Sequence, residues 1–188
     1  MWAGTGAGRV LISKNINDVP ASVTFTRIDT AAQPGRAVSS IFADPSNANH
    51  AIVTFSGFDV TTPTTPGHVF DVVFDPTSNT ATWTNISYDI GDQPVNDAVL
   101  DVSTGDVYVS TDFGVLRLAE GAQTWVAVGD GLPSAAVSGL TLAASKNGDR
   151  LALRGDPRSR RLAAPPALDG LLAAKGPGDG ALRPLGHG

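Results

Sequence analysis

The sequence contains no cysteine, and this absence excludes disulfide bridges, thiolate zinc sites and cysteine nucleophiles. Charged residues are also scarce, at 16% of the 188 residues, and the net charge is −5. A chain of this charge repels phosphate, so we expect no nucleic-acid partner that binds by counterion release. No apolar run approaches the roughly 20 residues of a membrane-spanning helix. The N-terminal MWAGTGAGRV lacks the basic and apolar regions of a signal peptide, so the chain is expected to carry neither a membrane span nor a signal peptide.

The residues that are present divide the chain in two near residue 150. Every valine, every threonine and every aromatic residue precedes Leu151. Short alternating runs of these residue types fit the pleated, half-buried face of a sheet, so residues 1–150 are predicted to form strands separated by turns. Residues 151–188 are rich in Leu, Ala, Gly, Arg and Pro. They predict a low-complexity tail that is disordered or weakly helical, with at most a short helix over 167–175.

The tail also has the composition that a GC-rich gene yields in a shifted frame, because Gly, Ala, Arg and Pro have codons dominated by G and C. Residues 155–163, written with permitted codons and read one base later, give Ala-Thr-His-Gly-Arg-Gly-Gly-Trp. We therefore interpret 151–188 as out-of-frame translation. A natural flexible extension is the alternative.

An internal repeat organises residues 1–150. A motif that begins with valine occurs three times, at Val38, Val95 and Val137. A second motif, threonine followed by phenylalanine or tryptophan, begins at Thr24, Thr82 and Thr124. Both motifs advance by 57 or 58 residues and then by 42. The longer first step contains the Thr/Pro-rich segment 61–67, which cannot continue a central strand and is predicted to be a loop.

A period of about 40 to 50 residues with four short strands is typical of a β-propeller blade. In the third copy, strands are predicted over 96–101, 106–110, 114–119 and 124–128. The predicted fold class is all-β, an incomplete β-propeller of roughly three to four four-stranded blades. An immunoglobulin-like sandwich is the alternative, but it predicts no recurrence of the Thr-aromatic pair. The repeat phase makes Trp83 and Trp125 core residues between blades rather than sugar-stacking platforms.

Residues 107–125, followed by the Gly-Asp-Gly-Leu-Pro of 129–133, resemble blades of the sialidase, sortilin and xyloglucanase-like propellers that carry Asp-box (BNR) repeats. In that family the box reads Ser/Thr-x-Asp-x-Gly-x-Thr-Trp between the third and fourth strands. This copy keeps Thr124 and Trp125 but has Glu120 at the Asp position. The resemblance, which extends to WD40/YVTN-like repeats, implies the C-terminal fragment of a bacterial parent that is extracellular or periplasmic.

Carboxylates are the only catalytic candidates in the sequence. Glycoside hydrolysis, the reaction that the resemblance brings into consideration, needs two of them about 5 to 10 Å apart. Asp92 and Asp97 lie beside the start of a predicted inner strand, and Asp112 lies in the turn after the next strand. Each is more simply a turn residue that accepts backbone hydrogen bonds. The sequence therefore assigns no catalytic residue.

No cofactor or metal site is predicted either. The glycines of segment 4–8 lack the preceding strand and following helix of a phosphate-binding loop, so they predict a turn. The histidines His50, His68 and His187 have no spacing that places two ligands on one face.

Through the resemblance, the sequence predicts a module that binds a protein or carbohydrate, without catalysis by this chain. Two alternatives stay open. One is a fragment of a sialidase or xyloglucanase-like glycoside hydrolase, and the other is an intracellular scaffold similar to the photosystem assembly propellers.

Overall fold

The computed structural model describes residues 1–129, 135–145 and 148–154. These residues form β-strands and two single-turn 3₁₀ helices, so the predicted all-β class is confirmed. In the described part of the chain, neither helix has the length or apolarity needed to cross a membrane. The predicted tail lies outside the described residues except for 151–154, which belong to a strand that continues past the expected division at residue 150. The helix expected over 167–175 also lies outside them.

The strands form three antiparallel sheets and a hairpin, each built from strands that are consecutive in the chain. The first sheet contains β1 (Trp2–Gly4), β2 (Val10–Ile12) and β3 (Thr26–Arg27). The second contains β4 (Val38–Ala43), β5 (His50–Phe55), β6 (Val69–Asp75) and β7 (Thr80–Asn85). The third contains β8 (Val95–Asp101), β9 (Asp106–Thr111), β10 (Gly114–Leu118) and β11 (Trp125–Val128). The hairpin contains β12 (Gly139–Ser145) and β13 (Gly148–Arg154), and the helices are η1 (Pro20–Ser22) and η2 (Asp59–Thr61).

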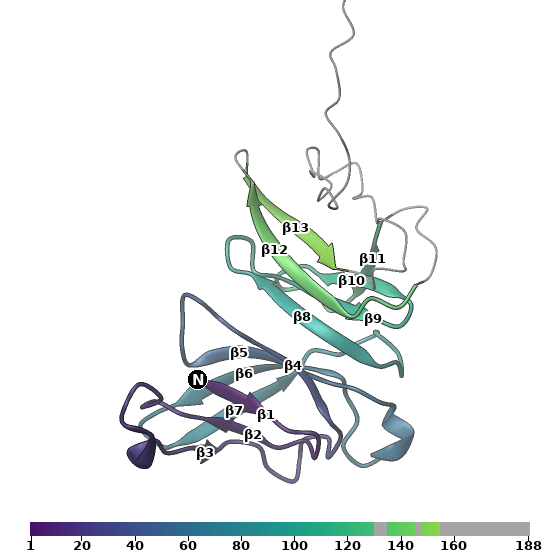
Figure 1. Cartoon of the computed structure of the whole chain (residues 1–188). Helices are drawn as coiled ribbons and strands as arrows, with labels where there is room; N and C mark the ends of the chain where they lie inside the picture. Colours follow the sequence, from purple (N-terminus) through teal and green to yellow (C-terminus); the bar gives the residue numbers. More distant parts are fainter. Residues whose placement is uncertain (130–134, 146–147, 155–188) are drawn as a thin grey trace, which may run out of the picture.

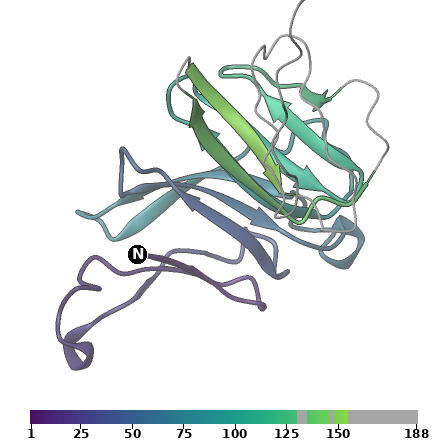
Figure 2. The same ribbon diagram turned by 45° about the horizontal axis from the view of Figure 1, so that its top comes forward.

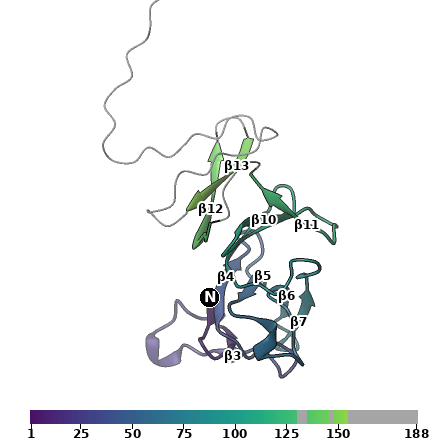
Figure 3. The same ribbon diagram turned by 90° about the vertical axis from the view of Figure 1, so that its right-hand side faces the viewer.

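The sheets follow one another in space in the order of the chain (Figure 1). The second sheet lies between the first and the third (Figure 2). Figure 3 shows the second sheet from β4 to β7, with the hairpin and β3 at opposite ends of the molecule. The strands β4, β8 and β12, which open the second sheet, the third sheet and the hairpin, contact one another in sequence. Within the described residues, the sheets do not close into a ring.

The sequence repeat coincides with this organisation. The valine motif begins at the first residue of β4 and of β8, and two residues before β12. The Thr-aromatic pair lies within β7, spans the start of β11 and immediately precedes β3. In the third sheet the four strands lie within about one residue of their predicted bounds. The Thr/Pro segment 61–67 lies in the connection between β5 and β6, as predicted.

A β-bulge interrupts the first strand of both four-stranded sheets at the same repeat position. The pairing of β4 with β5 shifts between Val38 and Ser40, and the pairing of β8 with β9 shifts between Val95 and Asp97. A bulge adds one residue to one strand and increases its local twist. Both first strands are therefore bent where they meet the neighbouring sheet.

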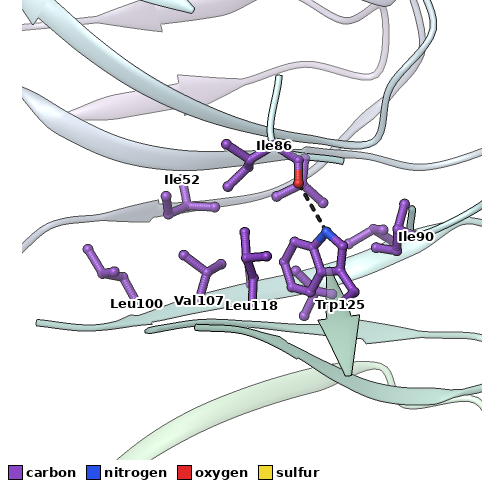
Figure 4. Packing of buried hydrophobic residues seen from close by; sticks show 11 residues of the cluster. Ile52, Ile86, Ile90, Leu100, Val107, Leu118 and Trp125 are labelled. Carbon is purple, nitrogen blue, oxygen red and sulfur yellow. Dashed lines mark hydrogen bonds between the residues drawn. The ribbon is translucent and has the colours of Figure 1, made fainter. Parts of the chain in front are cut away.

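An indole hydrogen bond links each of the two four-stranded sheets to the sheet before it. Trp125 of β11 donates its Nε1 hydrogen to the Ile86 carbonyl at 3.0 Å (Figure 4). Trp83 of β7 donates in the same way to the Ile28 carbonyl, also at 3.0 Å. Ile28 and Ile86 occupy equivalent positions in the repeat, because each directly follows the last strand of the preceding sheet. The prediction that both tryptophans lie between sheets is confirmed.

Hydrophobic clusters fill the spaces between successive sheets. The cluster between the second and third sheets surrounds Trp125 and includes Ile52, Leu100 and Leu118 (Figure 4). The cluster between the first and second sheets includes Ile12 and Phe55, and a third joins Tyr108 to the start of β12. Each sheet thus buries its apolar faces against its neighbours rather than against helices.

Replacement of Trp125 by alanine is expected to lower the free energy of unfolding by about 3–5 kcal/mol, because it opens a cavity between two sheets. Trp125→Phe is expected to cost less, since it keeps much of the apolar area and loses the bond to Ile86. Phe25→Ala is the matched control, because Phe25 holds the same motif position in the first sheet and is 45% exposed. Urea denaturation of the full chain measures all three, and an equal loss for Phe25→Ala would contradict the assignment.

Candidate functional site

Asp97 joins the first strands of three successive sheets. Its Oδ1 accepts hydrogen bonds from the Ser40 hydroxyl of β4 and from the Ala98 N–H of its own strand. Its Oδ2 accepts from the Leu140 N–H of β12 at 2.8 Å. The bulge in β8 turns this carboxylate between its neighbours. Both carboxylate oxygens of Asp97 therefore accept hydrogen bonds that hold neighbouring strands together.

The other two candidate carboxylates have different partners. Asp112 follows β9 and accepts a hydrogen bond from the Asn96 side-chain amide at 3.0 Å. The same amide donates to the Val137 carbonyl, so Asp112 supports the start of the hairpin segment. Asp92 lies in the connection between β7 and β8 and accepts from the Asp59 N–H. No hydrogen bond of the described residues joins any two of Asp92, Asp97 and Asp112.

An open hollow of about 570 Å³ lies along the first strands, between β4, β8 and β12. Its walls are mainly apolar, with Ile41, Phe42, Val99 and Leu140 among the lining residues. The half-exposed Val102 extends it at the turn between β8 and β9. A concave apolar surface with a few polar groups is the usual form of a ligand-binding site.

A second candidate site gathers Arg36, Asp59, His68 and Asp92 at one end of the second sheet. Arg36 precedes β4, Asp59 begins η2, and His68 directly precedes β6. Arg36 Nη1 lies 2.7 Å from Asp59 Oδ1, and the Gly67 N–H donates to the same oxygen at 2.9 Å. The second guanidinium nitrogen of Arg36 donates to the Gly67 carbonyl. The loop between β5 and β6 is therefore held against the start of β4.

His68 lies beneath the two carboxylates. Its Nε2 is 3.3 Å from Asp92 Oδ1 and 3.5 Å from Asp59 Oδ1. Burial lowers the pKa of His68, so the ring is uncharged at neutral pH. Burial alone would raise the pKa of Asp59, but hydrogen bonds from Arg36 and from the Gly67 N–H hold it below its ordinary value. The site thus combines a neutral imidazole with an ionised carboxylate.

His50 has a different arrangement of carboxylates. Its Nδ1 lies 2.8 Å from Asp44 Oδ2, and its Nε2 lies 3.3 Å from Asp71 Oδ1. Hydrogen bonds from His50 and then from Ser46 lower the pKa of Asp44 to about 2. The two carboxylates face opposite nitrogens of the ring, so this group joins β5 to its neighbours.

The spacing of the histidines relative to one another does not reveal the grouping of His68 with Asp59 and Asp92. Twenty-four residues separate His68 from Asp92, and only the pairing of β6 with β7 returns the chain to the same end of the sheet. His187 lies outside the described residues. The glycine segment 4–8 forms the turn between β1 and β2, as predicted, and Gly8 has a φ of 74° that other residues rarely adopt.

Comparison of the chain with protein-family models, with curated proteins and with solved structures found no match. The resemblance to Asp-box propellers therefore stays a prediction from the sequence.

Asp97→Asn is expected to lower the free energy of unfolding by about 2 kcal/mol, because an amide NH₂ would replace one of the acceptor oxygens. The matched control is Asp112→Asn, which keeps an oxygen for its partner Asn96 on the surface. Thermal and urea unfolding of the full chain measure both variants. Equal losses for the two would show that Asp97 does not join the sheets.

The pH dependence of stability is expected to change in Asp44→Asn. A carboxyl group whose folded pKa is about 2, against 3.8 ordinarily, stabilises the fold above pH 4 and loses this contribution as the pH falls toward 2. The stability difference between the parent chain and Asp44→Asn should therefore be largest near neutrality and shrink between pH 4 and 2. Unfolding curves recorded across this range test it, and a difference that is independent of pH contradicts it.

Proposed function

We propose that the chain is part of a β-propeller of the Asp-box class, in an exported parent protein, and that it binds a protein or glycan. The propeller interpretation is supported by sheets that repeat in chain order, by bulges at equivalent positions, and by the indole bond from each four-stranded sheet to the sheet before it. Radially repeated four-stranded meanders are the architecture that such a repeat favours.

The observation that carries the binding function is the apolar hollow along β4, β8 and β12. Asp97, which lines it, is occupied as an acceptor by Ser40 and Leu140. The hollow therefore offers area and shape for a ligand, while its carboxylate holds the sheets together. This combination favours binding over chemistry at this position.

The test is a screen of the full chain against a glycan array and a displayed peptide library, followed by titration of any ligand found. Val102→Arg, at a residue that is 50% exposed and lines the hollow, is expected to weaken binding at least about tenfold. Val126→Arg is the matched control, because Val126 is 61% exposed on β11 and lies outside the hollow. Equal effects of the two substitutions would contradict a site in the hollow.

The same protein separates the binding function from the glycoside hydrolase alternative. Incubation with aryl-glycosides and xyloglucan measures turnover directly. Turnover that is abolished by Asp112→Asn, with the fold retained, would favour the enzyme and overturn the binding proposal.

A further inference from the structure

Three potential ligand atoms converge at the end of the second sheet. They are His68 Nε2 and one carboxylate oxygen each from Asp59 and Asp92, and all lie within 4.8 Å of one another. The residues come from three separate segments: η2, the residue before β6, and the connection from β7 to β8. Convergence of this kind is a property of the folded chain and is independent of the hollow described above.

His68 supplies a second observation that points to a ligand. Its side chain is only 1% exposed, and its Nε2 makes no hydrogen bond to any described residue. The nearby oxygens of Asp59 and Asp92 are 3.5 and 3.3 Å away but are not aligned for one. A buried polar atom without a partner costs about 1–3 kcal/mol, and such atoms are rare unless a water, an ion or a function accounts for them.

His50 shows that two neighbouring carboxylates alone do not make such a site. Asp44 and Asp71 contact opposite nitrogens of its ring, so no single ion can reach both of them and the ring. At His68 both carboxylates face the same nitrogen.

We propose that His68, Asp59 and Asp92 bind a divalent first-row transition ion, for which Zn²⁺ is the natural probe. An imidazole nitrogen with two carboxylate oxygens suits Zn²⁺ and its neighbours in the series, whereas Ca²⁺ and Mg²⁺ prefer oxygen ligands throughout. Three protein ligands leave a fourth tetrahedral position. Asp92 is 44% exposed, so that position is open to solvent or to a small ligand.

Arg36 acts as a positioning residue in this site. The bonds from Arg36 and from the Gly67 N–H both fall on Asp59 Oδ1, the oxygen that lies 3.5 Å from His68 Nε2, and so fix this carboxylate toward the ring. Arg36 Nη2 lies 3.4 Å from His68 Nδ1, and because a guanidinium only donates, Nδ1 is the acceptor and the neutral ring carries its proton on Nε2 while no ion is bound. Coordination through Nε2 therefore displaces this proton.

The bound ion would join the loop after β5 to the connection that leads into β8. Asp92 already accepts a hydrogen bond from the Asp59 N–H, so the two segments meet before any ion is present. The ion would thus stabilise the junction of the second and third sheets, through ligands that bind only when the fold is formed.

Isothermal titration of the EDTA-treated full chain with ZnCl₂ tests the proposal, and binding of one ion is expected. Asp92→Asn should weaken the affinity at least about tenfold, because it removes a ligand charge. It keeps an oxygen for the Asp59 N–H, and the exposure of Asp92 favours retention of the fold. His68→Gln should abolish binding, and His50→Gln is the matched control that should leave the affinity unchanged.

Nitrogen-15 NMR of histidine-labelled protein gives an independent readout. On addition of Zn²⁺, the Nε2 resonance of His68 should shift to the metal-bound range while the resonances of His50 stay unchanged. Absence of Zn²⁺ binding, an affinity insensitive to Asp92→Asn, or loss of binding in His50→Gln would each overturn the proposal. A His68 Nε2 that keeps its proton in the presence of Zn²⁺ would instead assign the cluster to a hydrogen-bond network that only supports the loop.

Discussion

Each small sheet in this chain has two faces to cover, and no helix in the described residues is long enough to cover either. The apolar side chains of one sheet are therefore buried only against the next sheet, and the clusters around Ile12, Trp125 and Tyr108 are the result. The hydrogen bonds from Trp83 and Trp125 to carbonyls at the end of the preceding sheet add direction to this contact. Burial keeps the sheets together, and the indole bond sets how they meet.

The polar groups follow the same arrangement. Where the first strands approach each other, backbone N–H groups and hydroxyls at the bulges need acceptors, and Asp97 supplies them for β4, β8 and β12 together. At the end of the second sheet, Arg36 and Asp59 order the long Thr/Pro loop, which leaves His68 buried beneath two carboxylates. The proposed ligand surface and the proposed ion site thus both lie at junctions between sheets.

Much of the strand pattern follows from local sequence. Alternation of Val, Thr and aromatic residues requires a pleated surface, and the 42-residue recurrence places equivalent strands in each sheet, as β8 to β11 confirm. The bulges in β4 and β8 have no such signal, because a shift of register depends on the partner strand. The roles of Asp97 and His68 were missed for a related reason, since their partners Leu140 and Asp59 lie in other segments.

The sequence by itself determined the all-β class, the four strands of the third sheet and the packing of Trp83 and Trp125 between sheets, because strand preference and repeat phase are properties of short segments. Only the tertiary structure decided which carboxylates serve the fold and which converge on His68. The order of residues along a chain does not fix distances between loops; those distances are set when strands pair and sheets pack, and chemistry depends on them.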